Sequence, residues 1–359
     1  MIYKRIKRAY SDSIYKSLHA PMTTSLNRPD AYEGVFTLQD FKFESGQTLP
    51  ELSIGYVRYG ELNARRDNLL LVLPGTGNIR HSVIDHIGPG RAYDPDHYCV
   101  ISTDAIGGGC SSKPADGLGS AFPDYSIRDM VHAQVQFVRN GLDLGNQPIA
   151  VLAGASMGAF QALEWIIHYP DMVQSAVLLV PDWHASQSFK LATQRMFDIV
   201  KLDPKWKQGH YQQTPSEGLI LAGKHYFAWT VTDQYIAETD FTSLEHEAQS
   251  AGNGFANWDA WSLLKRYQAS SRHDVSAPFD ADLTQALGHV KARTLVLPCT
   301  QERLLSFEGA KQIADGIKSA CFAPVDSTKG HLAWRAAPGS PQTKSITWTI
   351  RTFLNLETH

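Results

Sequence analysis

The sequence predicts an α/β fold in which helices flank a mostly parallel sheet, with a helical cap inserted between two strands. Short apolar runs alternate with helical patterns over much of the 359 residues. One of these runs, residues 149–153, leads through a glycine-rich turn directly into a helical pattern. Residues 184–287 break the alternation, since they lack clear strand signals and are rich in helical patterns. Strand–helix alternation is typical of parallel sheets, because a helix carries the chain back between neighbouring parallel strands.

The chain opens with two expected strands, 34–43 and 52–59, whose serine–glycine connection is typical of an antiparallel hairpin. Ser126 and Asp129 predict the start of a capped helix that ends before Gly145. Later strands are expected at residues 68–73, 97–104, 149–153, 175–180, 294–300 and 321–325. Further helices are expected at residues 159–168, 308–318 and 343–354.

These patterns predict three parts of the chain. Residues 1–25 form an N-terminal arm, residues 26–183 and 288–359 form the α/β core, and residues 184–287 form the cap. Most aromatic side chains of the cap are expected to form its own core, while a few line an apolar tunnel above the turn that follows residue 153. The cap aromatics are Phe197, Trp206, Tyr226, Phe227, Trp229, Trp258 and Trp261.

Composition excludes several classes of partner. The formal net charge of −3 gives no electrostatic reason to expect nucleic acid or an anionic membrane. No 18-residue apolar run occurs, and residues 1–16 lack the apolar core of a signal peptide. The four cysteines show no C-x-x-C spacing, which favours a reduced, cytoplasmic protein.

The most informative motif is Gly154-Ala155-Ser156-Met157-Gly158. It has the G-x-S-x-G form and lies between an expected strand and an expected helix, which is the context of a nucleophile elbow. Such a turn admits only small neighbours, and it raises the serine hydroxyl at the carboxyl end of the strand. We therefore predict that Ser156 is a nucleophile.

A serine nucleophile needs a base, which in an elbow fold lies after the last strand. His331 meets this description and is predicted to be the base. The acid that orients its imidazole should follow the strand at 294–300, where Glu302 is the first choice. Two alternatives stay open: Glu302 is a solvated charge paired with Arg303, or Asp182 is the acid.

The tetrahedral intermediate carries an oxyanion that needs two N–H donors. One is expected from Met157, and the other from Thr76 in the loop after an early strand. Gly75 and Gly77 let this loop approach a substrate closely, so they belong to the expected substrate pocket.

Rival motifs fail on their spacing. Residues 75–80 begin like a dinucleotide fingerprint, but Arg80 stands in the place of the third glycine. Residues 107–113 lack the form of a phosphate loop, so their glycines are expected to serve a tight surface turn or a wall of the site. His246-Glu247 lacks the second histidine of a zinc helix, and no metal is predicted.

Longer motifs carry a family resemblance. The matching stretches are residues 87–92, 122–123, 126–131, 154–165 and 169–173, together with Gly330-His331. From about residue 34 to its end, the chain resembles the homoserine O-acetyltransferase family of α/β-hydrolases. The resemblance implies the α/β-hydrolase fold, Ser156 as nucleophile and His331 as base, and a homodimer formed through the cap. Glu302 falls where the family usually has aspartate.

The chain departs from the family where the acetyltransferases hold the charged ends of homoserine. Leu332 stands where an aspartate directly after the histidine would meet the ammonium group. Gly223 replaces the arginine that would meet the carboxylate, and Thr230 replaces a tyrosine. A zwitterion without its charge partners would lose several kcal/mol per end on burial. The expected pocket therefore favours an uncharged alcohol portion.

These features predict a serine carboxylesterase that hydrolyses short-chain esters, acetates above all, of small uncharged alcohols through an acyl-serine intermediate. No cofactor is expected. One alternative is an O-acetyltransferase that uses acetyl-CoA and homoserine or another acceptor. A second alternative is a non-catalytic binding protein, against which an intact Ser156 and His331 argue.

Overall fold

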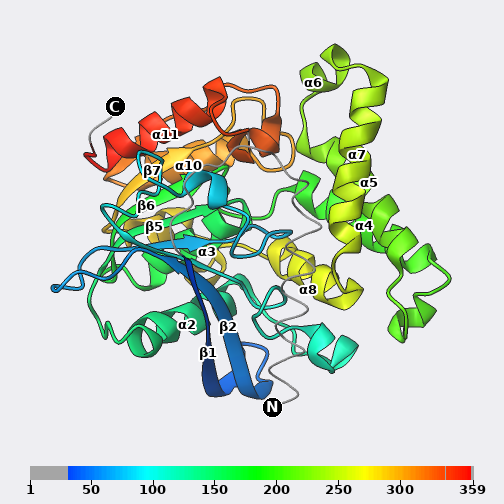
Figure 1. Cartoon of the computed structure of the whole chain (residues 1–359), viewed down its shortest axis with the longest axis horizontal. Helices are drawn as coiled ribbons and strands as arrows, with labels where there is room; N and C mark the ends of the chain where they lie inside the picture. The colour runs from blue at the N-terminus through cyan, green and yellow to red at the C-terminus, as the bar shows by residue number, and fades with distance from the viewer. Residues whose placement is uncertain (1–30, 336, 357–359) are drawn as a thin grey trace.

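The computed structural model describes residues 31–335 and 337–356, which contain an eight-stranded sheet (Figure 1). The strand order is β1-β2-β4-β3-β5-β6-β7-β8. β2 is antiparallel to both β1 and β4, and all other neighbouring pairs are parallel. The strands are β1 (Ala31–Lys42), β2 (Thr48–Tyr59), β3 (Leu69–Leu73), β4 (Cys99–Thr103), β5 (Ile149–Ala155), β6 (Val173–Leu179), β7 (Arg293–Leu297) and β8 (Ala320–Phe322). The predicted arm at residues 1–25 lies outside the described residues.

The central strands are buried on both faces because helices cover the sheet from both sides. The covering helices are α2 (Ile127–Gln136), α3 (Met157–His168), α10 (Phe307–Gly316) and α11 (Pro341–Phe353). In β3, Leu71 and Leu73 belong to the apolar cluster that contains residues of α2, α3 and α10. Leu70 and Val72 belong to a second cluster, which contains residues of α11. The period-two alternation of one strand thus supplies both layers of the core.

α2 begins where the sequence predicts because its first turn is capped. Ser126 Oγ accepts a hydrogen bond from the Asp129 N–H (3.0 Å), and the Asp129 carboxylate accepts one from the Ser126 N–H (2.8 Å). This reciprocal pair satisfies two N–H groups that have no partner inside the helix. Beyond Gln136 the chain continues as a π-helix over Phe137–Gly141.

Six helices lie between β6 and β7, in the segment predicted to be a cap. They are α4 (Gln187–Leu202), α5 (Ser216–Thr230), α6 (Asp233–Glu238), α7 (Phe241–Ala256), α8 (Ala260–Ser271) and α9 (Leu283–Gly288). In Figure 1 the helices α4 to α7 stand together beside the sheet, and α8 lies between them and the core. We call α4 to α9 the helical insertion; its treatment as a separate cap with limits at residues 184 and 287 stays a prediction.

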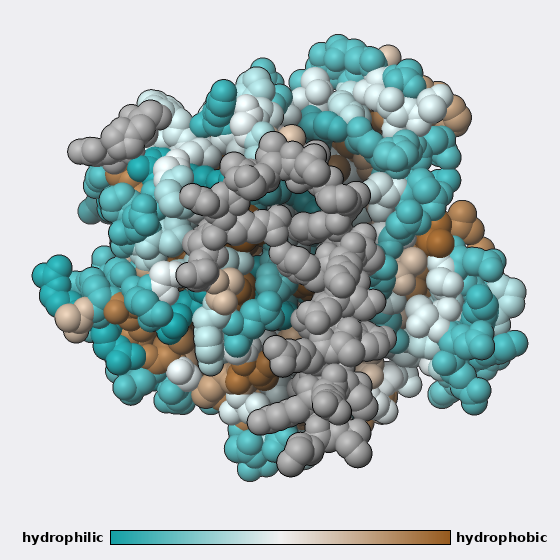
Figure 2. Space-filling view, in the orientation of Figure 1, coloured by the Kyte–Doolittle hydropathy of each residue, from teal (hydrophilic) through white to brown (hydrophobic). Residues whose placement is uncertain are grey.

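None of the helices in the described residues is long and apolar enough to cross a bilayer. Figure 2 shows one face, mostly hydrophilic, with a hydrophobic patch at the edge of the helical insertion. The exposed large apolar side chains of the insertion are Leu191, Leu202, Leu221, Ile236 and Phe241.

Candidate active site

Ser156 occupies the sharp turn between β5 and α3, with φ 57° and ψ −122°. A positive φ is strained for a residue with a side chain, so the surrounding backbone must hold it. The Ser156 N–H donates to the Leu179 carbonyl of β6 (3.0 Å). A Cβ atom on Gly154 would collide with the Gly158 carbonyl, and one on Gly158 would collide with the Leu73 carbonyl. The small residues of the motif are therefore required by the turn itself.

Ser156, His331 and Glu302 form one hydrogen-bonded chain. His331 Nε2 lies 2.9 Å from Ser156 Oγ, and His331 Nδ1 lies 3.0 Å from Glu302 Oε2. A carboxylate only accepts hydrogen bonds, so Nδ1 carries the proton and Nε2 is left to accept the serine hydroxyl proton. The side chains are buried, with 8% exposure for His331 and 3% for Glu302. This arrangement can deprotonate the serine as it attacks a carbonyl carbon.

The Glu302 carboxylate is held by its own loop. Oε1 accepts hydrogen bonds from the N–H groups of Leu304 (2.9 Å) and Leu305 (3.2 Å), which leaves Oε2 for His331. The neighbouring Arg303 pairs with Asp233 of α6 (2.9 Å). The structure therefore brings Glu302 to the imidazole rather than to Arg303.

Asp182, the alternative acid, binds backbone N–H groups and not the imidazole of His331. It is fully buried, and its carboxylate accepts hydrogen bonds from the N–H groups of Ser306 (2.8 Å) and Trp183 (2.9 Å). His184 Nδ1 lies 3.4 Å from the same carboxylate. Ser306 caps α10, so Asp182 anchors the start of that helix. These contacts give Asp182 a structural role and leave Glu302 beside His331.

The two expected oxyanion donors lie next to the elbow. Gly75 to Asn78 form a turn closed by the hydrogen bond from the Asn78 N–H to the Gly75 carbonyl (3.1 Å). A Cβ on Gly75 would lie 3.3 Å from the Ala155 carbonyl, so this turn runs alongside the serine turn. Within the described ranges, neither the Thr76 N–H nor the Met157 N–H donates to an acceptor. Both are therefore free to bind an oxyanion.

Aromatic side chains of the helical insertion lie beside this turn. A Cβ on Gly77 would lie 3.7 Å from the Tyr267 hydroxyl, and the Tyr226 ring meets the Tyr267 ring edge-on at 5.1 Å. Burial raises the pKa of both phenols further above neutral pH, so both side chains are uncharged there. Sequence reasoning named Tyr226 only among the cap aromatics and missed Tyr267, because no local motif marks a helix residue that tertiary packing brings to a loop.

The three positions that depart from the family pattern lie in apolar or tightly packed surroundings. Leu332 packs against a cluster of the insertion that contains Phe227 and Val231. Thr230 is buried and donates its hydroxyl to the Phe227 carbonyl (2.7 Å). Gly223 lies where α5 crosses α7, and a Cβ there would lie 2.7 Å from the carbonyl of Ala251. Helix packing thus explains the small residue at 223, and an arginine would not fit without moving α7.

In the stretches 31–335 and 337–356, no group of three or more histidine, cysteine, aspartate or glutamate side chains is arranged to hold a metal ion.

Known proteins resemble this chain over most of its length. A family model described as alpha/beta hydrolase fold matches residues 68–309. The chain is 31% identical over 307 residues to an ethyl acetate hydrolase of Pseudomonas veronii, covering 80% of this chain and 86% of that protein. It is 30% identical over 341 residues to a homoserine O-acetyltransferase of Leptospira biflexa, covering 83% and 88%. The chain belongs to the homoserine O-acetyltransferase family of α/β-hydrolases. The predicted fold class and family are confirmed.

Among solved structures, the acetyl esterase MekB superposes with a TM-score of 0.83 and 26% identity, covering 92% of this chain and 99% of that one. Family members thus carry the names of ester hydrolases and of acyltransferases alike. The comparisons therefore support an α/β-hydrolase enzyme that is either an ester hydrolase or an acyltransferase.

Proposed function

We propose that this chain is a serine carboxylesterase that hydrolyses short-chain esters, acetates above all, of small uncharged alcohols. The observation that carries the proposal is the hydrogen-bonded chain from Ser156 through His331 to Glu302. Leu332, beside the histidine, supports the choice of an uncharged substrate because it packs in an apolar cluster.

In the proposed mechanism, Ser156 Oγ attacks the ester carbonyl while His331 Nε2 takes the hydroxyl proton. Glu302 holds the imidazole and stabilises its protonated form. The N–H groups of Thr76 and Met157 bind the oxyanion of the tetrahedral intermediate. Its collapse expels the alcohol, which takes the proton from His331 and leaves an acyl group on Ser156. His331 then deprotonates a water molecule that attacks the acyl-serine, and the acid leaves as the serine regains its proton.

A rival function shares the first half of this reaction. An O-acetyltransferase would form the same acyl-serine from acetyl-CoA and pass the acyl group to homoserine or another acceptor. The relatives named homoserine O-acetyltransferase favour this candidate. The chain's own residues argue against homoserine, since its ammonium would meet Leu332 and its carboxylate would find no arginine at Gly223.

The decisive experiment measures where the acetyl group goes. Purified protein is given p-nitrophenyl acetate, ethyl acetate, longer acyl esters and O-acetylhomoserine, with and without homoserine, and acetate and acetylated products are quantified. We expect neutral acetates to be hydrolysed fastest and homoserine to leave acetate release unchanged. Efficient transfer to homoserine with little hydrolysis would overturn the esterase proposal.

Two further expectations are proposals at this stage. We infer a cytoplasmic homodimer that associates through the helical insertion. In support of the association, Leu202, Leu221 and Phe241 expose large apolar surface on the insertion. Sedimentation of the wild-type chain and of a Phe241→Ser variant tests it, with a shift toward monomer expected in the variant.

A further inference from the structure

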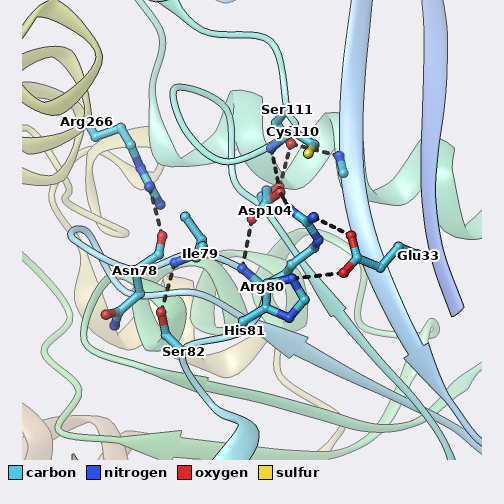
Figure 3. Close-up of polar contacts among 11 residues, drawn as sticks. Glu33, Asn78, Ile79, Arg80, His81, Ser82, Asp104, Cys110, Ser111 and Arg266 are labelled. Carbon is cyan, nitrogen blue, oxygen red and sulfur yellow. Dashed lines mark hydrogen bonds and ion pairs between the residues drawn. The ribbon is translucent and has the colours of Figure 1, made fainter. Parts of the chain in front are cut away.

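Arg266 of α8 is a fully buried guanidinium with no ion-pair partner in the described part of the chain. Its Nη1 donates to the Asn78 carbonyl (2.9 Å) and its Nη2 donates to the Gly75 carbonyl (3.2 Å). Its guanidinium also lies over the Trp258 ring, 5.0 Å from the centroid. Figure 3 shows the side chain reaching toward Asn78. The nearest carboxylate that acts on it electrostatically, Asp104, does not pair with it directly. A buried charge without a direct ion-pair partner is costly, so a structure that keeps one calls for an explanation.

The carbonyls that Arg266 binds belong to the turn beside the serine. The Gly75 carbonyl and the Thr76 N–H are parts of one peptide group, and a trans peptide points these two bonds in opposite directions. No cis peptide occurs in the described residues. Holding the Gly75 oxygen therefore fixes the direction of the Thr76 N–H, away from Arg266. A hydrogen bond to the carbonyl also polarises the amide and strengthens its N–H as a donor.

The glycine run that sequence reasoning left as a turn makes room for this guanidinium. A Cβ on Gly108 would lie 2.6 Å from Arg266 Nη1, and one on Gly107 would lie 2.7 Å from Arg266 Cγ. Gly107 also has φ of 91°, which disfavours any residue with a side chain. The segment is thus one wall of a compartment built around Arg266.

The far end of the same loop is anchored without Arg266. Arg80 donates to the Asp104 carboxylate from its N–H (2.8 Å) and from Nη1 (2.7 Å), and Nη2 binds Glu33 (2.6 Å; Figure 3). The Asp104 carboxylate also accepts the Cys110 N–H (2.7 Å), which ties this loop to the glycine run. Removing the Arg266 guanidinium would therefore leave the Gly75 carbonyl with the Asn78 N–H (3.1 Å) as its remaining donor, while the rest of the loop stays attached.

We propose that Arg266 is a positioning residue for the oxyanion hole: through the Gly75 carbonyl it aims and polarises the Thr76 N–H. This inference rests on the proposed esterase function. Arg266 has a fixed positive charge behind a peptide whose other side faces developing negative charge. Such preorganised charge stabilises a transition state more than a ground state. The helical insertion then contributes to the chemistry of the site as well as to its walls.

The test compares Arg266→Met with a neighbour on the same helix. Lys265 is also buried, and its Nζ donates to the Phe122 carbonyl (2.6 Å) in a different loop, so Lys265→Met is the matched control. With p-nitrophenyl acetate, we expect Arg266→Met to lower kcat on the order of 10- to 100-fold, less than the loss of a direct oxyanion donor, with little change in KM. Lys265→Met should lower thermal stability and leave kcat near the wild-type value.

A transition-state analogue separates positioning from folding. A trifluoromethyl ketone forms an oxyanion on Ser156, whereas the matched methyl ketone binds as a ground-state mimic. In Arg266→Met the affinity for the trifluoromethyl ketone should fall in parallel with kcat/KM, with methyl ketone binding unchanged. Arg266→Lys keeps the charge and one donor, so its losses of kcat/KM and of trifluoromethyl ketone affinity should be smaller than those of Arg266→Met. If Arg266→Met does not fold, the Arg266→Lys ratio of the two inhibitor affinities decides the matter.

Unchanged kcat and unchanged trifluoromethyl ketone affinity in the arginine variants would overturn the inference. So would equal losses in Arg266→Met and Lys265→Met. These outcomes are distinct from failure of the proposed function, in which the wild-type protein itself hydrolyses no ester and a fluorophosphonate does not label Ser156.

Discussion

The core and the helical insertion contribute to the candidate site in different ways. Ser156, Glu302 and His331 all follow strands of the core, and hydrogen bonds of 2.9 and 3.0 Å join them. The insertion supplies neighbours of these groups: the rings of Tyr226 and Tyr267, the cluster around Leu332, and the guanidinium of Arg266. The proposed reacting groups thus come from the core, while the insertion surrounds and orients them.

The insertion is also tied to the two loops that carry the proposed base and acid. Lys329, two residues before His331, pairs with Glu247 of α7 (3.1 Å). Arg303, next to Glu302, pairs with Asp233 of α6 (2.9 Å). Exposed pairs of this kind contribute little stability each, so they mark where the insertion contacts the two loops.

The largest expected effect tests the core. Ser156→Ala should lower ester hydrolysis on the order of 10⁴-fold or more, because no other group can form the acyl intermediate. Steady-state hydrolysis of p-nitrophenyl acetate measures it, with thermal unfolding as the check that the variant is folded. Residual activity within tenfold of wild type would contradict the assignment of Ser156.

The second prediction separates the two acids of the core. Glu302→Gln should lower kcat on the order of 10²- to 10⁴-fold, because an amide does not stabilise the imidazolium. Asp182→Asn should instead lower the unfolding temperature, since Asp182 holds the Ser306 N–H (2.8 Å), and should leave most of kcat. A larger kcat loss in Asp182→Asn than in Glu302→Gln, measured below both unfolding temperatures, would reverse the assignment.

Much of the core could be predicted because its signals are local. β3 and β6 lie within a residue or two of their predicted spans, since each is a short apolar run that ends at a turn. β7 was expected to reach residue 300 but ends at Leu297, because Pro298 has no N–H to donate. β8 likewise ends at Phe322, two residues before Pro324.

The candidate site could be predicted only in part, because some of its contacts join residues that are far apart in the sequence. Ser156 and His331 follow from motif and chain order, but Asp182 and Glu302 both lie just beyond neighbouring strands, and only the contacts distinguish them. Arg266 was not predicted at all. Its partners are backbone carbonyls 188 and 191 residues earlier in the chain, and no side-chain pattern in a sequence records such a contact.

The third prediction acts at the boundary of the two regions. Leu332→Asp places a carboxylate beside the apolar cluster of Phe227 and Val231. Hydrolysis of neutral acetates should fall about tenfold, equivalent to about 1.4 kcal/mol of transition-state free energy. Leu332→Asn is the matched control, with the same shape and no charge, and should lose less. Equal losses in the two variants would show that charge is not what the pocket excludes.

The last prediction concerns stability and not activity, at a buried contact between the two regions. Glu164 of α3 lies 3.0 Å from His168 Nε2 and 3.5 Å from Nδ1 of His273, which follows α8. Burial raises the pKa of Glu164, but the two imidazoles outweigh it and lower the pKa to about 2.

Because the folded pKa lies below the unfolded value of 4.5, Glu164 stabilises the fold above about pH 4.5 and loses this effect as the pH falls toward 2. Glu164→Gln should therefore lower stability at pH 7 on the order of 2 kcal/mol, and the gap to wild type should narrow between pH 5 and pH 3. Thermal unfolding of both proteins across this range measures the gap. If the stability difference between wild type and Glu164→Gln stays constant with pH, Glu164 stabilises this contact by its packing and not by its charge.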